Sequence, residues 1–527
     1  MPEKIKVLAV DDEKFNLILL RGCLKSDMYD ITGCTNAVDA LQEFKKQYFD
    51  VLLLDVLMPG IDGFELRKLI REIDAERPII FLTALVDDIN TTMLNQISWD
   101  PYTYYLNKSF SKKLLSSKIE QAVGVHRSRK TADAYSRKLE DEMALAGDIQ
   151  KILLPAWCVV DSKTMMGAYY APSGKVSGDL YEFMHISGGK YLLFIGDIAG
   201  HGMQAALYMA AMQSVLKVFI ARDNVTPHEL LNHLNEFFCS ELCANTYMTC
   251  LAAVIDFDAN KISVQSAGHP GLIGCSHLKE NAWRIGDDSR GGPPVGWFEN
   301  IKYSPDDTTE ATFPDDTLIV GYTDGLIDAC SRDNQTMDES ELFELIGVLS
   351  LSSDAATFPF RLGVSLGQLG YDQSPDDVCV IAVQKNTADG VKFQNKVILP
   401  KLSMVSTTAI EFAGILQKSR NDMELATKIE ILMYEYLNNV IIHGSEGTRG
   451  PRDPIYVSMT VSENEISVRG LDRGKVWDMA GSYQPAQQPL NEPTFGRGIQ
   501  IIREITDHVT HGCYNGLNET VFSIKLG

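Results

Sequence analysis

Four aspartates at the ends of apolar runs constrain this chain more than any other feature. They are Asp179, Asp197, Asp324 and Asp376, and each stands beside glycine, serine or a second acid. We therefore expect each carboxylate at the rim of a sheet. Four converging carboxylates repel one another unless hard cations lie between them, and all-oxygen ligation suits Mg²⁺ or Mn²⁺. Aspartate also ends strands and begins turns without any metal, and for one such site alone that simpler interpretation is the better one. The four together favour a pair of divalent ions that can activate water and clamp a phosphoryl group.

The order and the amino-acid sequences of these segments resemble those of the metal-dependent protein phosphatase (PPM) family, in its bacterial sporulation and stress-response branch. The resemblance covers about residues 151–383, and Gly196-Asp197-Ile198-Ala199-Gly200-His201-Gly202 is its most specific part. It implies that Asp197 bridges two ions and that the carbonyl oxygen of Ile198 binds one of them. It also implies that Asp179, Asp324 and Asp376 complete the ligand set, with Asp377 as the second choice for the last place. His201 could protonate the leaving group, but a lone histidine beside glycine is more often structural, so it stays outside the catalytic set.

Length and composition limit the remaining possibilities. The chain has 527 residues, which suggests three or four domains, and 45% hydrophobic with 22% charged residues is ordinary for a globular protein. We expect no membrane span and no signal peptide. The ten cysteines form no Cys-x-x-Cys pair, so we also expect a reducing cytoplasmic location. The net charge of −22 opposes binding to nucleic acid.

The first 123 residues alternate short apolar strands with amphipathic segments, which is typical of a doubly wound parallel sheet. Polar residues follow the expected strands, and ligands of such sheets bind at the carboxyl ends of strands. This region resembles the response-regulator receiver family, with Ser109 where the family usually has proline. The resemblance implies phosphorylation of Asp55 and binding of Mg²⁺ by Asp11, Asp12 and Asp55. It also implies switch roles for Thr83, Tyr105 and Lys108. An unphosphorylated receiver kept only for docking is the weaker alternative.

Residues 124–154 contain no internal proline and predict a long helix that Pro155 ends. One apolar stripe recurs at three- and four-residue steps: Leu139, Met143, Ala146, Ile149 and Leu153. So narrow a stripe suits a helix pair or a two-chain coiled coil, and packing onto the neighbouring domain is the equal alternative. The last ten residues resemble the regulatory lead-in helix of the same phosphatase branch.

The C-terminal region predicts a nucleotide site. A helix over residues 426–443 places Glu435 and Asn439 on one face, where a carboxylate can accept a hydroxyl proton and an amide oxygen can hold Mg²⁺. Asp472 at a strand end can contact adenine, and glycines at a helix start can approach phosphates. Together these motifs resemble the GHKL-type ATPases, specifically the anti-sigma-factor serine kinases, over about residues 399–527. The resemblance implies Glu435 as catalytic base, Asn439 as the Mg²⁺ ligand and a nucleotide cradle of Asp472, Gly474, Gly496 and Gly498. A nucleotide-binding but catalytically idle domain is the alternative.

The expected fold is multidomain α/β and α+β. It comprises a doubly wound receiver (1–123), a helical linker (124–155), a PPM β-sandwich with flanking helices (156–386) and a GHKL α/β sandwich (387–527). The expected cofactors are Mg²⁺ for the receiver and kinase, two Mn²⁺ or Mg²⁺ ions for the phosphatase, and ATP.

The expected function is that of a two-component response regulator. Its phosphorylated receiver would control a serine/threonine phosphatase and an opposing serine kinase, both acting on a STAS-domain anti-sigma-factor antagonist. Expected partners are a sensor histidine kinase, the STAS protein, a sigma or anti-sigma factor, and a second copy through the linker helix. The rival hypothesis keeps only the phosphatase and makes the C-terminal region an anti-sigma or partner-binding module. Signalling by receiver-driven dimerisation alone is a third hypothesis. A histidine-kinase interpretation fails because no suitable phospho-accepting histidine precedes the ATPase-like region.

Overall fold

The computed structural model divides into two compact units, Met1–Glu142 and Met143–Gly527. It describes residues 4–526 apart from 26–27, 84–99, 223–224, 243–245, 287–290, 332, 334, 372–373, 389–391, 445–452 and 476–496.

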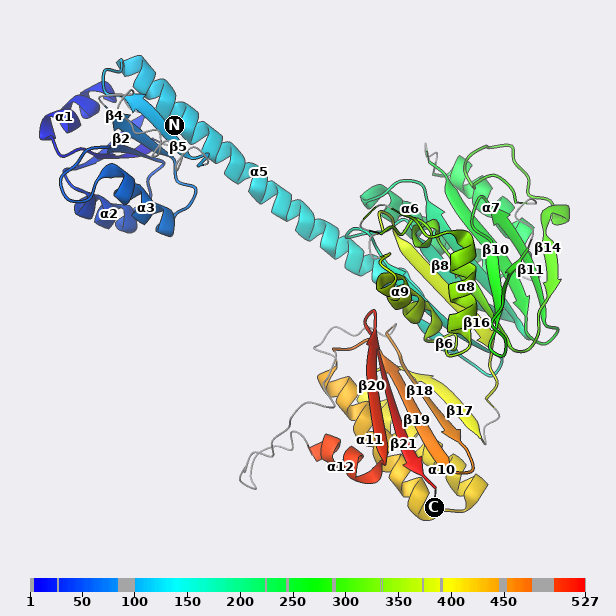
Figure 1. The fold of residues 1–527 in the computed structure, drawn as a ribbon. Coiled ribbons are helices and arrows are strands. Elements are labelled where there is room, and N and C mark those ends of the chain that lie inside the picture. Colours follow the sequence, from blue (N-terminus) through cyan, green and yellow to red (C-terminus); the bar gives the residue numbers. More distant parts are fainter. Residues whose placement is uncertain are drawn as a thin grey trace. The chain divides into compact units, whose positions relative to one another are not determined.

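The first unit contains a parallel sheet in the order β2-β1-β3-β4-β5 (Figure 1). Its strands are β1 (Ile5–Val10), β2 (Tyr29–Cys34), β3 (Val51–Asp55), β4 (Ile79–Thr83) and β5 (Thr103–Asn107), and its helices include α1 (Lys14–Cys23), α2 (Ala37–Lys46) and α3 (Gly63–Ile73). One apolar cluster forms on each face of the sheet, because every residue of β3 is buried. The expected doubly wound parallel sheet is confirmed.

Helix α5 is longer than the sequence indicated and runs from Lys112 to Leu153 without a break. The expected start at residue 124 is therefore wrong, because the last receiver helix continues into the linker. Gly124 does not interrupt the helix, since one glycine costs only about 1 kcal/mol in a helix interior.

The apolar stripe of α5 is only partly buried. Leu139 is 48% exposed and Ile149 is 54% exposed, whereas Met143, Ala146 and Leu153 are half-buried. Gly147 and Gln150 of the same helix, and Leu154 directly after it, are buried.

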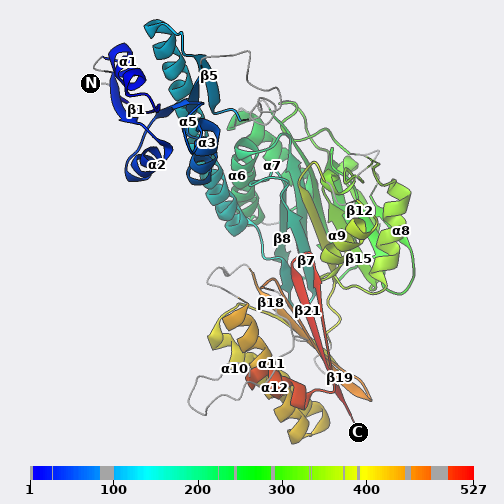
Figure 2. The same ribbon diagram turned by 60° about the vertical axis from the view of Figure 1, so that its left-hand side comes forward.

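Two antiparallel sheets stack on each other in residues 158–385 (Figure 2). One has the order β14-β11-β10-β9-β8 and the other β13-β12-β15-β16-β7-β6. Their strands are β6 (Cys158–Val160), β7 (Thr164–Ala171), β8 (Leu180–Ser187), β9 (Lys190–Ile198), β10 (Met248–Asp256), β11 (Lys261–Ala267), β12 (Leu272–Ser276), β13 (Ala282–Ile285), β14 (Thr309–Thr312), β15 (Thr317–Tyr322) and β16 (Val378–Lys385).

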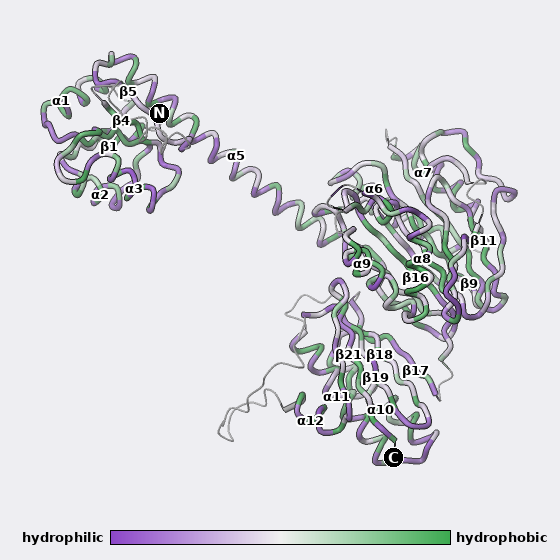
Figure 3. Tube along the Cα trace, in the orientation of Figure 1, coloured by the Kyte–Doolittle hydropathy of each residue, from purple (hydrophilic) through white to green (hydrophobic). Residues whose placement is uncertain are grey.

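Helices cover both outer faces of this sandwich. Helices α6 (Met203–Ile220) and α7 (Pro227–Ser240) pack on the sheet of β8–β11, while α8 (Glu339–Ser350) and α9 (Phe358–Gln368) pack on the other sheet. The shared core includes Ile195 of β9 and Ile381 of β16, which are both fully buried. Hydrophobic residues gather in these strands, as Figure 3 shows in green. The expected β-sandwich with flanking helices is confirmed.

Helix α6 is long and apolar enough to cross a membrane by length and composition alone, and 44% of it is buried inside the structure. The sequence analysis expected no membrane span. The buried residues of α6, among them Met209, Met212 and Leu216, belong to the core of the sandwich.

The C-terminal part of the second unit is an antiparallel sheet covered on one face by helices. The order is β17-β18-β19-β21-β20, with β17 (Phe393–Ile398), β18 (Ile455–Val461), β19 (Glu465–Asp472), β20 (His508–Tyr514) and β21 (Leu517–Lys525). Helices α10 (Leu402–Arg420), α11 (Met423–His443) and α12 (Arg497–Ile505) share one apolar core with it. Asp422 caps α11 by accepting a hydrogen bond from the N–H of Leu425. The expected two-layer α/β sandwich is confirmed.

Residues from the opposite face of this sheet join the core of the β-sandwich. Tyr456, Leu471 and Leu517 belong to the same apolar cluster as Phe358 and Phe360 of α9. Ion pairs flank that cluster, because Arg469 contacts both Asp354 and Glu519 at 2.6 Å and Arg361 contacts Glu519 at 2.9 Å.

Candidate functional sites

The receiver gathers three carboxylates at the carboxyl ends of β1 and β3. Ligand oxygens of Asp11, Asp12 and Asp55 lie within 4.8 Å of one another. The Nζ atom of Lys108 lies 3.0 Å from Asp11 and 2.8 Å from Asp55, so a cation of the chain itself neutralises part of this cluster. Burial raises the pKa of Asp55, and Lys108 opposes that rise. The arrangement can hold one divalent ion.

The turn after Asp55 has little room for side chains. A Cβ atom on Gly63 would lie 2.1 Å from the carbonyl oxygen of Asp55, so only glycine allows this close approach. Asp62 then begins α3 with a capping box that it forms with Glu65. Gly63 and the Asp62 cap thus fix the backbone next to Asp55.

The expected switch residues lie on neighbouring strands. Thr83 ends β4 and is buried, and its carbonyl oxygen accepts the N–H of Lys108 at 2.7 Å. Tyr105 stacks on Phe81 with the ring centroids 5.5 Å apart, and its hydroxyl is buried without a hydrogen-bond partner among the described residues. Ser109 donates to the side chain of Asn107 from both its N–H and its hydroxyl, so the loop that lacks the familial proline is held locally.

The sandwich brings the four sequence-predicted aspartates to one end of its two sheets. Asp197 ends β9, Asp179 precedes β8, Asp324 follows β15 and Asp376 precedes β16. A Cβ on Gly178 would lie 2.9 Å from the carbonyl oxygen of Ile198 and 3.3 Å from the Asp197 carboxylate, so these two oxygens are neighbours. The backbone of Gly325 packs against residues 376–377, which places Asp324 next to Asp376.

Burial and the charges of neighbouring carboxylates raise the pKa of three of these aspartates. Burial and then Asp324 and Asp376 raise the pKa of Asp197 to about 7. The pKa of Asp179 rises well above its ordinary value through burial and the charge of Asp197. The pKa of Asp324 rises through burial and the charge of Asp376. Such mutual repulsion makes the group a fit for bound cations.

Among the described residues, only the receiver triad brings three ligand atoms within 4.8 Å of one another. The sandwich aspartates do not meet that spacing. His201 is exposed on the loop between Gly200 and Gly202, whose φ angles of 104° and 83° favour glycine.

Thr323, which the sequence analysis did not single out, and Asp377, which it gave as the second choice for a metal ligand, hold Asp179 and its loop. The hydroxyl of Thr323 donates to the Asp179 carboxylate at 2.8 Å and accepts the N–H of Cys379. Asp377 accepts hydrogen bonds from the N–H groups of Ser173 and Gly178, so its carboxylate is engaged in holding the loop before Asp179. The only local signals for these roles were a threonine before Asp324 and an acid after Asp376.

The end of α5 holds the same loop from the other side. Gln150 donates to the carbonyl oxygen of Ser177 at 2.6 Å and accepts its N–H at 3.0 Å. A Cβ on Gly147 would lie 2.1 Å from the carbonyl oxygen of Lys175, so the helix and the loop touch backbone to backbone. Helix α5 therefore bears directly on the segment that leads to Asp179.

In the C-terminal sandwich, Glu435 and Asn439 lie beneath the start of α12. A Cβ on Gly498 would meet Glu435 Oε2 at 2.6 Å and Asn439 Nδ2 at 3.3 Å. The amide nitrogen of Asn439 is buried without a hydrogen-bond partner among the described residues. A buried amide group without a hydrogen-bond partner, next to a glycine, fits a site for a nucleotide and its Mg²⁺. Glu435 and Asn439 would contact that nucleotide and ion.

A second group lies at the end of β19. Asp472 is buried and accepts hydrogen bonds from the N–H of Gly474 at 2.8 Å and from the side chain of Asn518 at 3.2 Å. Asn518 stands opposite Asp472 in the β19–β21 register, and no local sequence signal pointed to it. The N–H of Lys475 donates to Gly444 at the end of α11, which brings this group near that helix. Gly496 lies outside the described residues.

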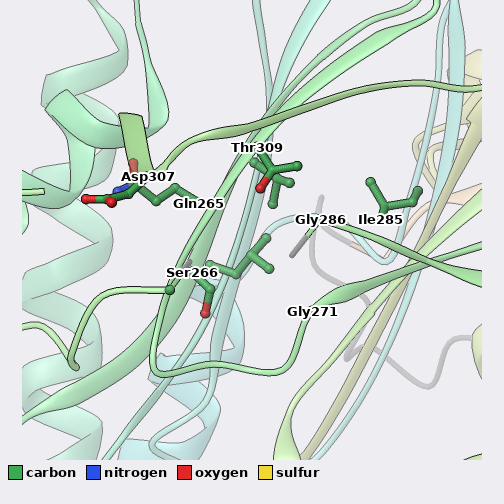
Figure 4. Close-up of a pocket in the computed structure, with 10 residues that line it drawn as sticks. Gln265, Ser266, Gly271, Ile285, Gly286, Asp307 and Thr309 are labelled. Atoms are coloured by element: carbon green, nitrogen blue, oxygen red, sulfur yellow. The ribbon is translucent and has the colours of Figure 1, made fainter. Parts of the chain in front are cut away.

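The β-sandwich also contains a small cavity that is separate from the four aspartates. It holds about 20 Å³, is lined by Gln265, Ser266 and Thr309 among others, and contains none of the four aspartates (Figure 4). That volume suits about one water molecule.

Three family models match this chain in succession. The response regulator receiver domain matches residues 7–120, stage II sporulation protein E (SpoIIE) matches residues 187–386, and the histidine kinase-like ATPase domain matches residues 399–523. The chain therefore carries a receiver domain, a SpoIIE-type PPM phosphatase domain and a GHKL-like ATPase domain.

Individual relatives share parts of this arrangement. Phosphoserine phosphatase RsbP of Bacillus subtilis (strain 168) is 29% identical over 196 residues, which are 36% of this chain and 45% of RsbP. Sensor protein EvgS of Escherichia coli (strain K12) is 42% identical over 84 residues, which are 16% of this chain and 7% of EvgS. The chain thus spans less than half the length of either protein. The solved RsbU and RsbW domains of Rv1364c from Mycobacterium tuberculosis are 18% identical, with 70% of this chain and 95% of that chain covered and a TM-score of 0.38.

Proposed function

We propose that this chain is a two-component response regulator with two opposing outputs. Phosphorylation of Asp55 by a sensor histidine kinase would control a metal-dependent serine/threonine phosphatase and an ATP-dependent serine kinase. Both would act on one STAS-domain anti-sigma-factor antagonist in the cytoplasm, and a sigma or anti-sigma factor would respond. The observation that carries the proposal is the group of four mutually repelling aspartates in a chain that also holds a receiver cluster.

In the phosphatase, Asp197 and the carbonyl oxygen of Ile198 would hold the ions together with Asp179, Asp324 and Asp376. Two bound Mn²⁺ or Mg²⁺ ions would supply activated water and neutralise the phosphoryl group. The chain's own contribution is the positioning of these oxygens. Thr323 orients the carboxylate of Asp179, and Asp377 fixes the backbone of Gly178 beside Ile198. No nucleophilic side chain is needed.

In the ATPase-like domain, Glu435 would accept the proton of the substrate serine, and Asn439 would hold Mg²⁺ on the triphosphate. Asp472 would contact adenine, and Gly474, Gly496 and Gly498 would leave room for the nucleotide. Gly498 lies so close to Glu435 and Asn439 that a Cβ atom there would be 2.6 Å from Glu435 Oε2, and this proximity of the three residues supports the arrangement. Glu435→Ala and Asn439→Ala should each remove ATP-dependent labelling of the STAS protein while its dephosphorylation continues. A lack of labelling in the wild-type chain would favour the partner-binding alternative.

Signal transfer would pass through α5. Near the end of α5, the side-chain amide of Gln150 donates one hydrogen bond to the backbone of Ser177 and accepts another from it. Ser177 lies two residues before Asp179. A shift of this helix would move the Asp179 loop, which gives the receiver a mechanical route to the phosphatase. Gln150→Ala should lower the response of the phosphatase to receiver phosphorylation, and Gln204→Ala, which changes an exposed glutamine on α6, is the matched control. An unchanged response in Gln150→Ala would remove this route.

The exposed apolar residues of α5 support self-association. Leu139, Leu145 and Ile152 are between 48% and 64% exposed. A second copy could cover them as a helix pair. Sedimentation of the full chain before and after Leu145→Asp tests this, and an unchanged mass would reject it.

A further inference from the structure

Two exposed aromatic side chains and one half-buried aromatic side chain form a patch on the phosphatase domain. Trp297 is 51% exposed and Phe298 is 56% exposed. The ring of Trp297 stacks on Tyr247 with centroids 4.6 Å apart and on Phe298 at 6.3 Å. We call Tyr247, Trp297 and Phe298 the aromatic patch. A single exposed aromatic residue needs no explanation, but contiguous exposed rings mark surfaces that bind other molecules.

Buried groups hold the patch in place from below. Asn235 of α7 is 2% exposed, and its amide accepts the N–H of Gly296 at 2.8 Å and donates to the carbonyl oxygen of Phe298 at 3.2 Å. Val295 and Met248 exchange two backbone hydrogen bonds. Gly296 has a φ of 85°, and a Cβ there would lie 2.3 Å from the ring of Phe238. The backbone under the exposed rings is therefore fixed before any partner arrives, which lowers the entropy cost of binding.

The aromatic patch is continuous with the loop that carries the expected metal ligands. The N–H of Ala199, the residue after Ile198, donates to the carbonyl oxygen of Tyr247 at 2.9 Å. The hydroxyl of Thr246 donates to the carbonyl oxygen of Ala199 at 2.8 Å. The backbone of Tyr247, a member of the aromatic patch, is therefore joined directly to the metal loop.

Charge limits what the patch can recognise. The chain has a net charge of −22, and a phosphoserine adds about −1.5 to −2, so long-range attraction does not favour their encounter. Contact between apolar side chains is independent of this repulsion. An apolar surface next to the site is thus the suitable way to hold a phosphorylated chain.

We propose that the aromatic patch docks the polypeptide segment that carries the phosphoserine, through apolar side chains next to that residue. The inference rests on the proposed phosphatase function and names its substrate class. Substrates would be phosphoserine segments flanked by leucine, phenylalanine or similar residues.

The test compares three substrates with the full chain in Mn²⁺. Two are synthetic phosphoserine peptides, one with leucine and phenylalanine beside the phosphoserine and one with serine and glycine there. The third is p-nitrophenyl phosphate, which has no amino acids flanking its phosphoryl group. Trp297→Ala and Phe298→Ala should each lower kcat/KM for the apolar peptide about tenfold and leave the other two substrates within about twofold. Leu278→Ala, which changes a 78% exposed residue in the same domain, is the matched control.

Equal kcat/KM for both peptides in the wild-type chain would overturn the docking proposal. So would an equal loss on all three substrates in both patch variants, or a change in oligomeric state that assigns the patch to contact between copies. Failure of the wild-type chain to hydrolyse any of the three would instead reject the phosphatase function itself, and the docking proposal with it.

Discussion

The receiver and the phosphatase domain both gather aspartates at strand ends, yet they neutralise them differently. In the receiver, Lys108 reaches Asp11 and Asp55 within 3.0 Å, so part of the compensating charge belongs to the fold. In the phosphatase domain, no ion pair among the described residues joins Asp179, Asp197, Asp324 or Asp376, and burial with mutual repulsion raises the pKa of three of them. The chain itself thus neutralises part of the receiver cluster, whereas among the described residues no cation of the chain pairs with the phosphatase cluster.

The largest expected effect is on catalysis by the phosphatase cluster. Asp197→Asn or Asp324→Asn should lower the Mn²⁺-dependent turnover of p-nitrophenyl phosphate by roughly a thousandfold, because several kcal/mol of metal-based stabilisation is lost. The thermal midpoint of the metal-free variants should not fall, since a repelling charge has been removed. Asp328→Asn, a change of an exposed acid outside the ligand set, is the control. Near-wild-type turnover at saturating Mn²⁺ in either variant would show that the ligand assignment is wrong.

The next effect concerns pH. The folded-state pKa of Asp197, about 7, is above its unfolded value, so the metal-free fold binds extra protons and loses stability as the pH rises from about 4 through 7. Metal ions compete with those protons, so Mn²⁺ should bind about tenfold more tightly at pH 8 than at pH 6, with proton release. Calorimetry in buffers of different ionisation enthalpy measures both. The same affinity at both pH values would mean that the cluster is already ionised and would break the comparison.

A smaller effect is expected in the receiver. Lys108→Met leaves two buried carboxylates without their cation and should cost about 1–2 kcal/mol of unfolding free energy in the absence of Mg²⁺, since the lysine is itself partly exposed. Added Mg²⁺ should restore most of the loss. Denaturant unfolding of the full chain, followed through the receiver transition, tests this, with Lys118→Met as the control. A loss that Mg²⁺ does not restore would indicate that Lys108 has a packing role instead.

The sequence predicted the site residues at strand ends better than the side-chain contacts between distant segments. Strands β1, β3 and β4 follow the expected apolar runs because buried parallel strands are apolar throughout. Asp55 and Asp197 were found because their neighbours in the sequence define the turn. Thr323 contacts Asp179 across 144 positions, and Asn518 contacts Asp472 across 46. Such contacts leave no local pattern, so only the fold could show them.

In the linker, a pattern was visible in the sequence but did not identify the contact. The apolar stripe is periodic, yet periodicity alone could not tell which face of α5 would be buried. A glycine and a glutamine, Gly147 and Gln150, make the contact with the phosphatase domain, because a backbone approach needs no apolar side chain. The exposed part of the stripe remains available for a second copy.

The central claim is that the receiver cluster controls the phosphatase cluster, and one measurement tests it most directly. The rate of Mn²⁺-dependent p-nitrophenyl phosphate hydrolysis is followed against beryllium fluoride, a phosphoryl mimic, in the wild-type chain and in Asp55→Ala. We predict that the mimic changes the wild-type rate, in the direction of faster dephosphorylation, and leaves the rate of Asp55→Ala unchanged. Equal rates at every mimic concentration in the wild-type chain, or an equal response in Asp55→Ala, would contradict the claim.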